Sequence, residues 1–172
     1  MTAYLGSTGT GTFDKNIKLE ADVEYTPVGF SNSAAQQVKF TGIFEGNNKK
    51  ITYVGTSAEE TGATARMSLF FSVSGTVRNL TTAGEIYGHN RVAPICVELS
   101  TGGLIENCTN YVSISPAAGT IVGEVHRYTA GFASVNYGSI ISCVNYGNIT
   151  GEEYASGITS RMYAGSKVEN CI

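Results

Sequence analysis

Residues 142–151, SCVNYGNITG, repeat the pattern of residues 107–116, NCTNYVSISP. In both stretches a cysteine is followed by one residue, then by Asn-Tyr, and then by a short segment rich in Ser, Asn, Val and Ile. The two cysteines, Cys108 and Cys143, are 35 residues apart. Because a fixed period of a few tens of residues is typical of solenoids and other repeat arrays, this repeat is the first evidence about the fold.

The cysteine ends a four-residue element that occurs four times. The copies are VRNL at 77–80, IENC at 105–108, IISC at 140–143 and VENC at 168–171. Their last residues, Leu80, Cys108, Cys143 and Cys171, follow one another at intervals of 28, 35 and 28 residues. The period is therefore about 28 residues, and the longer interval contains an insertion of seven.

Each copy of this element lies between two other β-prone segments. The preceding segments are LFFSV at 69–73, APICVEL at 93–99, GTIVGEV at 119–125 and SGITSRM at 156–162, and the following ones are GEIYG at 84–88, VSIS at 112–115 and GNITG at 147–151. Three short segments per period, separated by Gly, Ser, Asn or Thr turns, form one coil of a three-sided parallel β-helix. We therefore predict an all-β fold, a right-handed single-stranded parallel β-helix of about five coils.

The alternative is an ordinary β-sandwich in which the cysteine spacing arises by chance. The β-helix is favoured because the three segments keep the same order in every period. Equivalent residues of successive coils lie about 4.8 Å apart, so like side chains stack on like. We expect the Leu80, Cys108, Cys143 and Cys171 column to be a buried ladder, with Cys as a small hydrophobe. Asn79, Asn107 and Asn170 would occupy equivalent corners, where stacked amides hydrogen-bond and tolerate a left-handed backbone.

The 172 residues suit a single domain. We expect residues 1–66, which include NIKLEADVEY at 16–25, to form an N-terminal cap and the first coil, and residues 67–172 to form the regular repeats. The last coil lacks its third segment. The sequence is then either a fragment of a longer repeat protein or a subunit whose unfinished coil is completed by another copy, and these alternatives stay open.

Composition argues against several partner classes. The net charge is −3 and the basic residues are scattered, which disfavours nucleic acid or an anionic membrane as partner. Apolar runs are too short to span a bilayer. The N-terminus lacks the basic and apolar regions of a signal peptide, although a secreted origin is compatible with a mature domain.

The chain resembles the bacterial GLUG-motif β-helix proteins, which are named for a Gly-Leu-apolar-Gly signature. The segments that carry the resemblance are IKLEADVEYTPVGF at 17–30, FTGIFEGNNKKIT at 40–52, GGLIENCTNYVSIS at 102–115, GTIVGE at 119–124 and CVNYGNITG at 143–151. The resemblance covers residues 17–172, and Phe70, Phe71 and Cys96 depart from it at signature positions. It implies a β-helix in a bacterial cell-surface or secreted protein, and it implies no catalytic residues.

Few residues suggest catalysis, and we expect no enzyme activity and no cofactor. The only aspartates are Asp14 and Asp22, near the N-terminus. Glu106 and Glu169 belong to the repeated element, so an outward, solvated position explains them more simply than a catalytic role does. A dyad of His126 with one of the many serines is weak evidence. No Cys-x-x-Cys occurs, which disfavours a zinc site, and we favour free thiols over disulfides.

The best binding candidates lie in VHRYTAGFASVNYG at 125–138, where we expect the insertion to form a loop. Breaks in a solenoid often form its functional face. The candidates combine aromatic rings with a cation, as sites for sugars and peptides do; they are His126, Arg127, Tyr128, Phe132 and Tyr137. Alternatively, the loop folds back and its rings only cover the coils.

The sequence favours a non-catalytic extracellular or cell-surface module that binds or adheres to a host glycan or protein. Two alternatives remain open: a self-assembling head-to-tail fibre subunit, and a specificity or spacer module of a larger peptidase or glycosidase.

Overall fold

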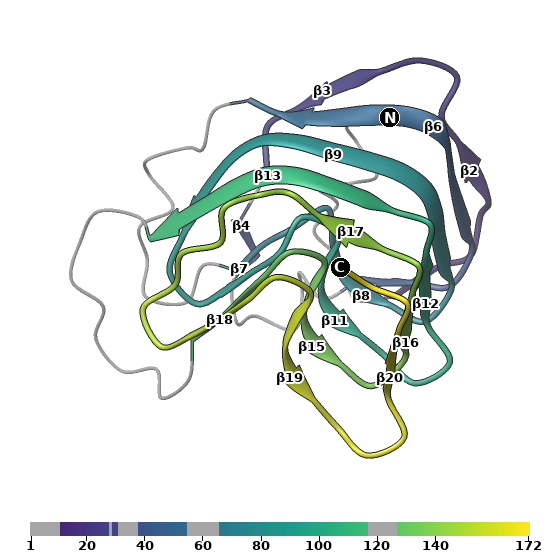
Figure 1. Ribbon diagram of the computed structural model, residues 1–172. Helices are drawn as coiled ribbons and strands as arrows, with labels where there is room; N and C mark the ends of the chain where they lie inside the picture. The colour runs from purple at the N-terminus through teal and green to yellow at the C-terminus, as the bar shows by residue number, and fades with distance from the viewer. Residues whose placement is uncertain (1–10, 28, 31–37, 55–65, 117–126) are drawn as a thin grey trace.

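The computed structural model describes residues 11–27, 29–30, 38–54, 66–116 and 127–172. Every element of regular structure in these residues is a β-strand. The strands stack into three sheets that together form a parallel β-solenoid of about five turns (Figure 1). The predicted fold class is therefore confirmed. We call one passage of the chain through the three sheets a rung.

The three sheets follow one another along each rung. The first sheet contains β1 (Thr12–Phe13), β5 (Lys39–Phe40), β8 (Phe70–Val73), β11 (Cys96–Leu99), β15 (Ala133–Asn136) and β19 (Thr159–Met162). The second contains β4 (Gly29–Phe30), β7 (Arg66–Met67), β10 (Arg91–Val92), β14 (Tyr128–Ala130) and β18 (Tyr154–Ser156). The third contains β2 (Ile17–Lys18), β3 (Val23–Tyr25), β6 (Ile43–Tyr53), β9 (Thr76–Gly88), β12 (Leu104–Glu106), β13 (Thr109–Pro116), β16 (Ser139–Ile141), β17 (Val144–Asn145) and β20 (Lys167–Glu169).

Parallel pairing in register produces the core. Ile105 of β12 is paired with Val77 of β9 on one side and with Ile140 of β16 on the other. These three side chains are fully buried. Because each rung repeats the inward positions of the one before, the apolar side chains form continuous columns along the solenoid. Among the described residues, β4 and β7 form the one antiparallel pair.

The cysteine column lies beside these strands. Leu80, Cys108 and Cys143 are buried, and Cys171 is partly exposed. All four cysteines of the chain, including Cys96, are free thiols. Burial raises the pKa of Cys108, whereas a side-chain hydrogen bond with Cys108 lowers the pKa of Cys143. The backbone N–H of Cys143 donates to Cys171 Sγ at 3.4 Å, so Cys143 and Cys171 are in contact across successive rungs.

The corner residue before each member of this column has a left-handed backbone. The φ angles are 54° at Asn79, 51° at Asn107, 53° at Ser142 and 54° at Asn170. The side chain of Asn79 donates to Glu45 Oε1 at 3.0 Å instead of to another corner asparagine. Asparagine is here chiefly a residue that tolerates φ above zero.

A hydrogen-bonded amide ladder lies instead three residues further along the chain. Thr82 Oγ1 donates to Asn110 Oδ1 at 2.7 Å, and Asn110 Nδ2 donates to Asn145 Oδ1 at 2.7 Å. Asn110 is fully buried. Its amide also accepts from the backbone of Val112 at 3.0 Å, so the buried polar group is satisfied within the third sheet.

The sequence-based assignment of one strand is wrong. Residues 119–125 were expected beside β11, but β15 occupies that position, and Ala133 is the register partner of Cys96. Residues 117–126 lie outside the described part of the chain. The physical reason is that β15, ASVN, is short and mostly small or polar, so its pattern is weaker than the Thr-Ile-Val run that precedes it.

The insertion also lies elsewhere than predicted. The connection from β9 to β10 is short, because β9 ends at Gly88 and β10 begins at Arg91. The equivalent connection from β13 to β14 is longer, because β13 ends at Pro116 and β14 begins at Tyr128. The extra residues of the long period therefore precede β14. Half of the segment 125–138 forms β14 and β15, which are part of the solenoid wall and not a loop.

The N-terminal block contributes rungs of its own. β2 and β3 pair in parallel with β6, and β6 pairs in parallel with β9. β1 pairs with β5, which stacks the ring of Phe13 on that of Phe40 at 6.0 Å, and Phe40 stacks on Phe70 at 4.7 Å. The described residues before Tyr53 thus extend the same columns.

The left-handed corner at Asn107 gives a test of the backbone argument. Its side chain is exposed, so a substitution acts mainly through φ. We predict that Asn107→Val lowers the free energy of unfolding by about 1–2 kcal/mol, because a β-branched residue is strained there, and that Asn107→Gly costs less. Urea unfolding measures both variants. Equal losses would contradict the left-handed corner.

Candidate ligand-binding cavity

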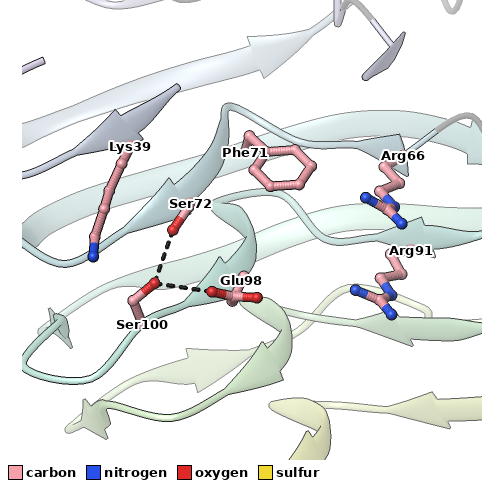
Figure 2. Close-up of a pocket in the computed structure, with 7 residues that line it drawn as sticks. All are labelled: Lys39, Arg66, Phe71, Ser72, Arg91, Glu98 and Ser100. Atoms are coloured by element: carbon pink, nitrogen blue, oxygen red, sulfur yellow. Dashed lines mark hydrogen bonds between the residues drawn. The ribbon is translucent and has the colours of Figure 1, made fainter. Parts of the chain in front are cut away.

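A cavity of about 330 Å³ opens on the outside of the solenoid, where the second sheet meets the first (Figure 2). Its lining comes from three successive rungs: Lys39, Arg66, Phe71, Ser72, Arg91, Glu98 and Ser100. Phe71 packs with Val97 in a small buried cluster separate from the main core. The cavity therefore has an apolar floor that belongs to the outer face of the wall.

Two arginines stand one above the other at one side of the cavity (Figure 2). Arg66 and Arg91 are on β7 and β10, which are adjacent parallel strands. The guanidinium carbon of Arg66 lies 5.6 Å from the centroid of the Phe71 ring, and that of Arg91 lies 5.8 Å from the Tyr128 ring. Such contacts hold the guanidinium planes by cation–π attraction.

A chain of hydroxyls and a carboxylate crosses the middle of the cavity. Ser72 and Ser100 share a hydrogen bond of 2.8 Å between their hydroxyl oxygens, and Ser100 Oγ donates to Glu98 Oε1 at 3.0 Å (Figure 2). Lys39 lies at the side opposite the arginines. Ser72, Glu98 and Lys39 share one column, because Lys39 pairs with Ser72 and Ser72 pairs with Glu98.

The charge of the cavity is opposite to that of the whole chain. Three cationic side chains and one carboxylate line it, whereas the chain carries a net charge of −3. Arg91 Nε is buried and has no hydrogen-bond partner among the described residues. Guanidinium groups bind carboxylates and related anions through paired N–H donors. The arrangement can therefore hold an anion while the serines and Glu98 contact hydroxyl groups.

Aromatic residues continue the same face toward the last rung. Tyr128 is the register partner of Arg91. Arg161 Nη1 donates to the Tyr128 hydroxyl at 2.7 Å, and the Arg161 guanidinium lies 4.6 Å from the Tyr163 ring. Tyr163 stacks on Tyr137 with ring centroids 4.1 Å apart. A side-chain hydrogen bond with Tyr163, together with burial, raises the pKa of Tyr137 to about 12.

The residues suggested by the sequence have different surroundings. Tyr137 is partly exposed on the face just described. Tyr128 lies on the same face but is only 4% exposed. Phe132 is fully buried in the main core, so it is a packing residue and has no surface to offer a ligand. Arg127 pairs with the Glu152 carboxylate, and its backbone N–H donates to Glu153 Oε2 at 3.1 Å. His126 lies outside the described residues.

Sequence reasoning missed all seven residues that line the cavity. They are far apart in the chain and form no local motif. One available signal was the register: Arg66 and Arg91 precede the inward residues Met67 and Val92, which are register partners. Correct alignment of the second sheet would have placed both arginines and Tyr128 in one outward column.

Metal ligands do not cluster in the part of the chain that the structure describes. No group of three or more His, Cys, Asp or Glu side chains there could hold a metal ion. His89 is buried, with Nδ1 at 3.8 Å from Glu152 Oε1. In the same ranges we find no helix that has both the length and the apolar character needed to span a membrane.

Comparison with known proteins adds no relative. A scan against protein-family models, a search of curated proteins and a search of solved structures each find no match to this chain. The fold and the cavity are therefore the basis for any statement about function.

The buried position of Phe132 separates a packing role from a ligand-binding role. We predict that Phe132→Ala lowers the free energy of unfolding by about 3–5 kcal/mol, because it leaves a cavity in the core. Tyr87→Ala, at a ring that is 44% exposed, is the control and changes stability by about 0.5 kcal/mol or less. Thermal and urea unfolding measure both. A stable Phe132→Ala variant would contradict the packing described above.

Proposed function

We propose that the protein is a non-catalytic binding module of an extracellular or cell-surface protein, with the cavity between the second and first sheets as its binding site. The observation that carries this proposal is the outward cavity with Arg66 and Arg91 at one side, Lys39 at the other and a serine–glutamate chain between them. The ligand class is a glycan or a protein. We further propose that the chain is related to the GLUG-motif proteins, on the sequence elements quoted above.

The lining favours binding over catalysis. Glu98 is the one carboxylate among the lining residues, whereas glycoside hydrolysis ordinarily uses a pair of carboxylates. Neither histidine nor cysteine belongs to the lining. The side chains that remain are suited to orientation of a ligand by charge, hydrogen bonds and one apolar surface.

The test is a screen of the purified protein against arrays of glycans and of extracellular-matrix proteins, followed by substitution in the cavity. We predict that Arg91→Glu lowers affinity for the ligand found by at least tenfold, because it reverses the charge of one wall. Lys167→Glu is the matched control, since it makes the same charge change at an exposed residue of the third sheet. The affinity of the Lys167→Glu variant for the same ligand should stay unchanged.

Two results would contradict this proposal. Equal losses in Arg91→Glu and Lys167→Glu would show that only net charge matters. A ligand whose affinity changes in neither variant would bind elsewhere on the molecule. Circular dichroism of each variant verifies that the fold is retained.

A second candidate function is end-to-end self-assembly, and the two ends of the described solenoid favour it. Partly buried hydrophobic residues that pack against the core lie at both ends; they are Phe13, Ile17 and Val23 at one end and Ile158, Val168 and Cys171 at the other. Strands at both ends run parallel to their neighbours. The first rung of one copy could therefore continue the last rung of another.

Light scattering and negative-stain microscopy over a wide concentration range, under reducing conditions, test this candidate. Head-to-tail stacking of about five rungs predicts filaments with an axial repeat of about 24 Å. A charged substitution at the edge, Val168→Glu, should prevent them. A monomer at every concentration would exclude self-assembly of this chain.

A further inference from the structure

The charged surface on this face extends beyond the cationic cavity. Arg161 lies on β19, and its contacts join two columns that begin in the cavity. Its hydrogen bond reaches Tyr128, the register partner of Arg91. Its guanidinium also lies over Tyr163, which stacks on Tyr137 immediately after β15. Arg161, a residue of the first sheet, thus touches Tyr128 of the second sheet, which shows that the two side chains face the same side.

The columns also connect Arg161 to the cavity directly. Glu98 is the register partner of Val135, and Val135 is the register partner of Arg161. Glu98, a lining residue, and Arg161 are therefore outward residues of one column, two rungs apart. On the rung between them Val135 and Tyr128 are buried, and Tyr137 is partly exposed.

The spacing of the cations along the solenoid is fixed by the rungs. Arg91 is on the rung before that of Tyr128, and Arg161 is on the rung after it. Two inter-strand spacings of about 4.8 Å separate Arg91 and Arg161 by about 9.6 Å along the axis. That distance is of the order of a disaccharide's length. The ring of Tyr128 lies between the two guanidinium groups, at 5.8 Å from Arg91 and 5.6 Å from Arg161.

The mixture of groups narrows the chemistry of the ligand. A purely anionic ligand would be attracted by Arg91 and Lys39 but repelled by Glu98. A ligand that carries both carboxylates and hydroxyl donors satisfies both requirements, since Glu98 accepts hydrogen bonds from hydroxyl groups. The stacked rings of Tyr137 and Tyr163 are partly exposed and offer apolar surface to the C–H faces of a sugar ring. Acidic sugars combine these features in one residue.

We propose that the site takes an acidic oligosaccharide bound along the solenoid axis, with one carboxylate at Arg66 and Arg91 and a second at Arg161. This inference rests on the proposed binding function and specifies its ligand class and its second subsite. Arg161 contacts the second carboxylate. Tyr128 is only 4% exposed, and its ring positions the guanidinium groups of Arg91 and Arg161.

Isothermal titration calorimetry tests the ligand class with four probes. Two are acidic hexasaccharides, one of galacturonate and one of hyaluronan; chitohexaose is the neutral sugar, and a hexaglutamate peptide is the anion without sugar. We expect at least one acidic hexasaccharide to bind, with affinity that falls as salt is raised. Chitohexaose and hexaglutamate should bind at least tenfold more weakly.

Substitution then tests the two subsites. Arg91→Gln and Arg161→Gln should each lower affinity for the acidic hexasaccharide about tenfold or more, and the corresponding acidic disaccharide should lose sensitivity to one of the two. Arg161→Lys is a second variant for the case that Arg161→Gln destabilises the fold, since lysine keeps the positive charge. Its affinity for the acidic hexasaccharide should lie between those of the unaltered protein and Arg161→Gln. Lys167→Gln, on the third sheet, is the control and should bind as the unaltered protein does.

The outcomes separate this inference from the proposed function. Tighter binding of chitohexaose or hexaglutamate, still lost in Arg91→Gln, would overturn the acidic-sugar inference and leave the cavity as a binding site. Acidic-sugar binding that is lost in Arg91→Gln but unchanged in Arg161→Gln and Arg161→Lys would overturn the second subsite. Failure of both acidic hexasaccharides to bind would overturn the inference, and the array screen would then decide the proposed function by itself.

Discussion

Parallel hydrogen bonding between successive rungs, in register, is the constraint on which the rest of this structure depends. It brings Ile86 beneath Ile114 and Thr81 beneath Thr109, so equivalent residues of successive rungs lie directly against one another. Inside, this repetition produces apolar columns and the buried amide ladder at Asn110. Outside, it places unlike charges in contact where they alternate, as at Arg78 between Glu45 and Glu106.

The sequence predicted the fold class because inward positions are the most restricted. Val77, Ile105 and Ile140 must all be apolar to fill one column. The residue three positions after each, which is Leu80, Cys108 or Cys143, reveals the period. The strand beside β11 was mispredicted for the opposite reason. Ala133 and Ser134 in β15 are buried but small, and burial of small or polar side chains leaves no periodic hydrophobic signal.

The candidate site was only partly predictable. Tyr128 and Tyr137 were candidates because they lie in the segment where the insertion was expected, beside a cation. Arg66, Arg91 and Arg161 come from three rungs, and only the exact register of two sheets brings them to one face. Binding chemistry on a solenoid is a property of outward columns, whose composition varies freely because packing does not restrict it.

The most direct test of the account is a measurement of the hydrogen bonds between rungs by NMR, through scalar couplings across them. The structure predicts a coupling between the amide nitrogen of Val144 and the carbonyl of Cys108, whose N···O distance is 3.0 Å. It also predicts one between Tyr137 and Leu99, at 2.7 Å. Couplings between residues close in sequence, as in antiparallel hairpins, would contradict the solenoid and every outward column derived from it.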